Sequence, residues 1–188
     1  MLSHPLLPKL KELRLSGMVD TLEERAELAR EQKLSPVEFL ALLIDDEIER
    51  RRQKKQSRME RTAGFESLKL LSGFDFAAAP TLDRALVLEM ATCSFISRHE
   101  NWLICGPTGV GKSHLATAIG YEAIKRDLKV LSFSVHKLLS NLFAARADGS
   151  YARLMHKLSS ADLVVLDDFG LRPITAQGAE DLYEIIHC

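Results

Sequence analysis

The segment Gly106-Pro107-Thr108-Gly109-Val110-Gly111-Lys112-Ser113 matches G-x-x-x-x-G-K-[ST], the Walker A pattern of a phosphate-binding loop, at every fixed position. Its glycines let successive backbone N–H groups turn toward one anionic centre, and a helix starting near Lys112 adds the positive end of its dipole. We expect Lys112 to reach the β- and γ-phosphates of a nucleotide and the Ser113 hydroxyl to bind Mg²⁺. The predicted nucleotide-binding residues are Gly106, Pro107, Thr108, Gly109, Val110, Gly111, Lys112, Ser113 and His114.

The residues around this loop have the pattern of an α/β fold. Trp102-Leu103-Ile104-Cys105 predicts a short buried strand, and residues 112–126 predict an amphipathic helix. This is the setting that the motif requires, whereas a glycine-rich turn without a ligand needs neither element. Strands separated by helices imply a parallel sheet. Further strands are predicted at 130–133 and 163–166, and further helices at 136–147, around Leu154 and Leu158, and at 177–187.

Two aspartates follow the apolar run 163–166, at Asp167 and Asp168. A carboxylate at the C-terminal end of a parallel strand lies in the crevice where α/β proteins bind ligands. We expect Asp167 to hold Mg²⁺ through water and Asp168 to orient or deprotonate the attacking water. Lys112 and Asp168 are therefore the predicted catalytic residues, Ser113 and Asp167 the predicted metal ligands, and ATP or GTP the predicted ligand. Either aspartate could instead cap the next turn, and this alternative has more weight for Asp168.

Residues 1–76 predict a small helical region ahead of a P-loop domain at 77–188. Leucines and alanines recur at helical spacing on both sides of a break that we place at Ser16-Gly17. A third helix has the clearest start, because Ser35 and Glu38 form a capping box around Pro36. Its predicted apolar face consists of Phe39, Leu40, Leu43, Ile44 and Ile48.

Basic residues gather between Arg50 and Arg61, where Glu60 is the single acidic residue. They could neutralise DNA phosphates, which would make binding weaken steeply with salt. They could equally form a solvated helix end that pairs with the acidic stretch before it. The net charge of -1 for the whole chain favours neither reading.

Composition indicates a soluble globular protein, with 46% hydrophobic and 27% charged residues in 188. No apolar run approaches the roughly 20 residues that span a bilayer, and the N-terminus lacks the continuous apolar core of a signal peptide. Cys93, Cys105 and Cys188 are scattered and predict neither a disulfide framework nor a metal site. A cytoplasmic location without membrane contact is the simplest interpretation.

These residues, in this order, resemble the IstB-like ATPases, the helper proteins of a bacterial insertion-sequence family. The likeness covers essentially the whole chain and implies an AAA+ ATPase related to the helicase loader DnaC and the initiator DnaA. It further implies ATP-dependent assembly of a homo-oligomer on double-stranded DNA and delivery of target DNA to a transposase. The stretches that carry it are Leu13–Met18, Ser35–Leu40, Glu49–Arg52, Phe74–Phe76, Asn101–Pro107, Gly111–Ala116 and Asp167–Gly170.

Two departures from the family pattern qualify this expectation. Asp168 stands where the superfamily commonly has glutamate, so its shorter side chain predicts slow hydrolysis, although the helper proteins often carry either acid. Family members also continue past Cys188, and the sensor strand between strands 102–105 and 163–166 is expected to be missing, which predicts an AAA+ module incomplete at its C-terminus. The rival functions are a helicase loader acting through the N-terminal helices and a remnant that does not hydrolyse ATP.

Overall fold

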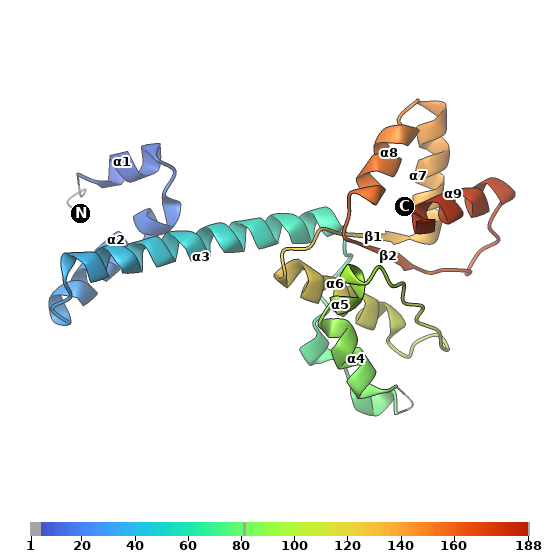
Figure 1. The fold of residues 1–188 in the computed structure, drawn as a ribbon, viewed down its shortest axis with the longest axis horizontal. Helices are drawn as coiled ribbons and strands as arrows, with labels where there is room; N and C mark the ends of the chain where they lie inside the picture. Colours follow the sequence, from blue (N-terminus) through green and yellow to red (C-terminus); the bar gives the residue numbers. More distant parts are fainter. Residues whose placement is uncertain (1–4, 81, 188) are drawn as a thin grey trace. The chain divides into compact units, whose positions relative to one another are not determined.

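Helices make up most of the chain (Figure 1). The structure is a computed structural model that describes residues 5–80 and 82–187, so Cys188 lies outside the described residues. The chain divides within α3 into two units, Met1–Ser57 and Arg58–Cys188. The elements in chain order are α1 (Leu7–Glu12), α2 (Ser16–Glu31), α3 (Pro36–Ala63), two 3₁₀ turns (Leu71–Gly73 and Phe76–Ala78), α4 (Arg84–Ala91), α5 (Ser94–Ser97), α6 (Lys112–Lys125), β1 (Val130–Ser134), α7 (Val135–Ala147), α8 (Tyr151–Ser159), β2 (Leu163–Asp167) and α9 (Ala176–His187).

The start of α3 confirms the predicted capping box. The backbone N–H of Ser35 donates to the Glu38 carboxylate at 2.8 Å, and the backbone N–H of Glu38 donates to Ser35 Oγ at 3.3 Å. These bonds satisfy two donors that a helix end otherwise leaves unpaired, and they lower the pKa of Glu38. The long third helix of the sequence analysis is thus present from its first turn.

The predicted break between the first two helices is present but lies at residues 13–15, because α2 already begins at Ser16 and contains Gly17 in its first turn. The glycine serves a close helix crossing instead. A Cβ added at Gly17 would lie 2.6 Å from the carbonyl oxygen of Asp46 and 2.6 Å from Cα of Glu47. The Gly17 N–H also donates to the buried Glu47 carboxylate at 2.6 Å. Only a residue without a side chain lets α2 and α3 approach this closely.

An ion pair supports the same crossing. Arg25 donates to both carboxylate oxygens of Asp46 at 2.8 Å, and the Thr21 hydroxyl donates to Asp46 at 2.7 Å. The hydrogen bond from Arg25 holds the pKa of Asp46 below its ordinary value. Two-point contact of this kind fixes orientation as well as distance.

The predicted apolar face of α3 is only partly buried. Leu43 is 6% exposed, whereas Leu40, Ile44 and Ile48 are 53%, 41% and 59% exposed. With Val37, these three residues form a row spaced three and four residues apart along one side of the helix. The predicted apolar face is therefore not one buried surface. The buried side of α3 carries Leu43 and Glu47, and α2 contacts it at Glu47. The row Val37, Leu40, Ile44 and Ile48 is called the α3 apolar row below.

The second unit is organised around two parallel strands, which confirms the α/β class. β1 and β2 pair from Val130 opposite Leu163 to Ser134 opposite Asp167. Side chains that alternate along β2 pack on opposite faces of the pair. Leu163 and Val165 contact the clusters built on α4, α5 and α6, and Val164 and Leu166 contact the cluster built on α7 and α8. Figure 1 shows the strands between α6 and the α7–α9 group.

The predicted strand at 102–105 is wrong, since residues 101–107 have no regular secondary structure. Backbone hydrogen bonds to a neighbour maintain a strand, and no described residue forms one with 102–105. Leu103 is accordingly 81% exposed. Trp102 contributes packing instead, with its ring edge-on to Phe95 at 6.1 Å between centroids.

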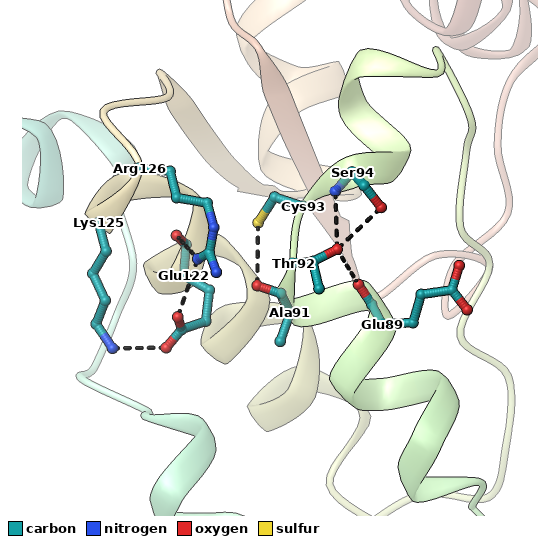
Figure 2. Close-up of polar contacts among 8 residues, drawn as sticks. All are labelled: Glu89, Ala91, Thr92, Cys93, Ser94, Glu122, Lys125 and Arg126. Carbon is teal, nitrogen blue, oxygen red and sulfur yellow. Dashed lines mark hydrogen bonds and ion pairs between the residues drawn. The ribbon is translucent and has the colours of Figure 1, made fainter.

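Two short helices that the sequence analysis did not predict, α4 and α5, meet at a tight corner (Figure 2). The Thr92 hydroxyl donates to the Glu89 carbonyl at 2.7 Å and accepts from the backbone N–H of Ser94. Cys93 takes a left-handed φ of 60°, is 5% exposed and packs with Ala123 and Ile124 of α6. Burial raises the pKa of its thiol. The corner therefore packs against α6.

Candidate nucleotide-binding site

The predicted phosphate loop passes directly into α6. Gly111 is the N-cap residue with φ 91°, Gly109 has φ 86°, and no side chain caps the helix. The first backbone N–H groups of α6 therefore have no capping side chain and point toward the loop. With the dipole of a helix of 14 residues, such N–H groups could hold an anion such as a phosphate.

The structure brings together the two parts of the site that lie far apart in the sequence. The Ser113 hydroxyl in the first turn of α6 donates to Oδ1 of Asp167 at the end of β2, at 3.0 Å. The same oxygen accepts the backbone N–H of Asp168 at 2.9 Å. The predicted metal ligands are thus neighbours because β2 ends beside the start of α6.

Those two side chains fit a magnesium ion. Mg²⁺ in nucleotide sites takes one or two protein oxygens and completes its shell with waters and phosphate oxygens. A hydroxyl and a carboxylate 3.0 Å apart supply that donor set, either directly or through a bound water. No group of three or more His, Cys, Asp or Glu with metal-binding geometry occurs in residues 5–80 and 82–187, so no separate all-protein metal centre competes for this role there.

Lys112 and Asp168, the predicted catalytic residues, lie at the start of α6 and directly after β2. Lys112 Nζ donates to the Pro107 carbonyl at 2.7 Å, so the ammonium group folds back over its own loop. A phosphate oxygen would replace this neutral carbonyl as a stronger, charged acceptor. Asp168 is exposed and adopts φ 57°, an uncommon backbone conformation for a residue other than glycine. The turn after Asp168 is closed by its backbone carbonyl, which accepts from the Leu171 N–H at 3.5 Å, and its carboxylate caps no N–H group of the described residues.

His114 lies between the predicted phosphate loop and the segment before α4. Its Nε2 lies 3.0 Å from the Leu70 carbonyl, and its ring is edge-on to Phe74 at 5.5 Å between centroids. These are packing contacts, and nucleotide binding by His114 stays a prediction. A hollow of about 470 Å³ opens beside it, lined by Gly73, Phe74, Asp75, Ala78, Thr108, Gly109, Val110, Gly111 and His114.

Phe74 and Phe76 lie in one of the stretches that carry the family resemblance. In the structure both belong to the cluster around Val87 and Leu115, and Phe74 also borders the hollow. Their position next to the loop could not be read from spacing, because more than thirty residues separate Phe74 from Gly111. The aromatic pair in Phe74-Asp75-Phe76 was the available signal.

Comparison with known proteins agrees with this geometry. Residues 8–188 match the model of the IstB-like ATP binding protein family. The chain is 39% identical over 186 residues to an insertion-sequence ATP-binding protein of Sinorhizobium fredii, covering 99% of this chain and 76% of that protein. It is 37% identical over 177 residues to an insertion-sequence ATP-binding protein of Mycobacterium tuberculosis, covering 94% of this chain and 70% of that protein. Within the described part of the chain, no helix has the length and apolar composition to cross a membrane.

Proposed function

Because this chain belongs to the family of IstB-like ATP-binding proteins, we propose that it binds ATP with Mg²⁺ on the loop Gly106–Ser113 and acts as a helper protein in DNA transposition. One observation carries the nucleotide assignment. The Ser113 hydroxyl and the Asp167 carboxylate meet at 3.0 Å beside the N-terminus of α6. N–H groups that can bind phosphate therefore lie next to oxygen ligands for magnesium, as binding of a nucleoside triphosphate requires.

ATP hydrolysis is part of the same proposal. Bound Mg²⁺ would neutralise charge on the phosphate oxygens. Lys112 would leave the Pro107 carbonyl for the β- and γ-phosphates, and Asp168 would orient the attacking water. Asp168 has one carbon fewer than glutamate and is exposed, so it holds that water loosely and turnover is slow.

DNA is the proposed macromolecular partner, and the basic run on α3 supports it. Some of these charges already have acidic neighbours: Arg50 pairs with Asp20 at 3.2 Å and Arg51 with Glu47 at 2.6 Å. Arg52 is exposed and forms no ion pair with any described residue. The acidic stretch thus neutralises part of the run and leaves other guanidinium groups for DNA phosphates.

The remaining elements of the proposal concern assembly. ATP binding would promote a homo-oligomer on double-stranded DNA in the cytoplasm, and this assembly would present target DNA to the transposase of the same insertion element. The α3 apolar row supports self-association, because four exposed aliphatic side chains in line form a surface that water solvates poorly. Capture of a replicative helicase instead of a transposase would favour the helicase-loader alternative.

The test is binding of Mg²⁺-ATP and of double-stranded DNA by the purified chain and two lysine variants. Lys112→Ala should abolish nucleotide-dependent DNA binding. Lys157→Ala removes an exposed lysine of α8, which contributes no residue to the site, and should behave as the parent. If Lys112→Ala binds DNA with the same ATP dependence as the parent, the proposed coupling between nucleotide and DNA is wrong.

A salt titration tests the DNA surface separately. Arg52→Gln should weaken DNA binding. It should also make the negative slope of log K against log salt shallower by about 0.9, for one lost phosphate contact. Arg30→Gln removes an exposed arginine of α2, outside the basic run, and should leave the slope unchanged. Equal slopes for all three proteins would exclude Arg52 from the DNA surface.

A further inference from the structure

The phosphate loop has an aromatic support on its outer side. The ring of Phe74 packs against Gly111 so closely that a Cβ added to the glycine would lie 2.9 Å from Cε2 of the ring. Gly111 is also the residue whose left-handed φ of 91° turns the chain into α6. Phe74 therefore contacts the loop at the point where its direction changes.

The rest of the loop has little packing of its own. Pro107, Thr108, Gly109 and Val110 are exposed, and a Cβ added to Gly109 would meet nothing within 4 Å. A segment with few packed contacts samples several conformations, and only some of these direct its N–H groups at one phosphate. The ring of Phe74 limits this freedom at Gly111.

Phe74 is itself held from two sides. Its ring is edge-on to Phe76, with 5.0 Å between centroids, and edge-on to His114 at 5.5 Å. Nε2 of His114 in turn lies 3.0 Å from the Leu70 carbonyl, which ties the 70–76 segment to the first turn of α6. Both the ring and its supports thus belong to the unit that carries the loop.

We propose that Phe74 is a positioning residue, which holds Gly111 and the phosphate loop in the conformation that binds phosphate. This inference rests on the proposed nucleotide function and deepens it, because it names a determinant of affinity outside the motif. Phe74 acts on the phosphates through Gly111. The rival role, stacking on the nucleoside in the adjoining hollow, predicts a different dependence on the ligand.

The experiment compares Phe74→Leu with Phe76→Leu, using Mg²⁺-ATP and Mg²⁺-tripolyphosphate as probes. Leucine keeps apolar volume in the cluster but lacks a flat ring to cover the glycine. If the binding conformation falls to a tenth of the free population, affinity falls about tenfold. Phe74→Leu should therefore lose about tenfold for both probes, because tripolyphosphate has no base and needs only the loop. Phe76→Leu removes one of the two ring contacts that hold Phe74 but leaves the contact between Phe74 and Gly111, so its loss for both probes should be clearly smaller than that of Phe74→Leu.

Each contrary result has a distinct meaning. Loss for ATP alone would show that Phe74 contacts the nucleoside, and equal losses in both variants would show that general packing of the segment matters; either overturns the positioning role. Unchanged affinities in Phe74→Leu would overturn it as well. If the parent chain binds neither probe, the proposed nucleotide function fails, and this inference fails with it.

Hydrogen exchange gives a second readout that does not depend on a ligand. In Phe74→Leu, the amide of Leu115, which donates to the Gly111 carbonyl at 2.9 Å, should exchange about tenfold faster than in the parent, while amides in β1 keep their rates. Unchanged exchange at Leu115 would contradict the proposal even if affinity fell. Should Phe74→Leu unfold, as judged by loss of protection in β1, Phe74→Met fills more of the space and takes its place in both measurements.

Discussion

The contact between Ser113 and Asp167 allows a quantitative test of the metal site by a double-mutant cycle. Ser113→Ala, Asp167→Ala and the double variant each remove part of the donor set that meets at 3.0 Å. With Mg²⁺-ATP bound, each side chain would contact the ion or one of its waters; a hydrogen bond to a charged group contributes about 1.5–3 kcal/mol, and we take the lower end because the pair is only partly buried. At about 1.4 kcal/mol per factor of ten, each single variant should bind Mg²⁺-ATP about tenfold more weakly.

The assay is fluorescence titration with a labelled ATP analogue, in Mg²⁺ and again in a chelator. If both side chains serve one ion, the double variant should lose no more than either single variant, and the three should differ little from the parent without Mg²⁺. Ser159→Ala on α8 is the control for loss of a hydroxyl and should match the parent. Additive losses in Mg²⁺, or equal losses in the chelator, would refute a shared magnesium site.

Three further predictions concern the rest of the chain. Gly17→Ala places a Cβ 2.6 Å from the Asp46 carbonyl oxygen, so overpacking of about 1–3 kcal/mol should outweigh a helix-propensity gain of about 1 kcal/mol. Urea unfolding should therefore show a net loss of stability. The control Gly73→Ala, whose Cβ would meet nothing within 4 Å, should show no loss. Burial first, and then hydrogen bonds to two carboxylates, raise the pKa of Tyr151 to about 12, so the folded state keeps a proton that the unfolded state releases above pH 10. Stability should therefore fall from pH 10 to 12 in the parent and less steeply in Tyr151→Phe, and parallel curves would contradict this account. Ile44→Glu places a charge in the α3 apolar row and should lower the mass measured by light scattering if that row mediates self-association, whereas an unchanged oligomer would exclude it.

The sequence predicted correctly those helices and strands that depend on residues close together in the chain. The capping box at Ser35 and Glu38 forms as expected, since both partners lie within one helical turn. The apolar run ending at Asp167 is a strand because alternate side chains find apolar neighbours on both faces. The phosphate loop precedes a helix because Gly111 can take the left-handed turn that its motif requires.

Contacts between residues far apart in the sequence decided the features that the sequence analysis missed. Trp102–Cys105 has the composition of a strand, yet a strand also needs a hydrogen-bonded neighbour, and no described segment supplies one. Gly17 resembled a helix break, but the nearby backbone of Asp46 and Glu47 explains its small size within α2. The sequence by itself thus determined the phosphate loop and its magnesium candidates, whereas the fold decided that Ser113 meets Asp167 and that Phe74 covers Gly111, because such contacts depend on how separate elements pack and not on spacing along the chain.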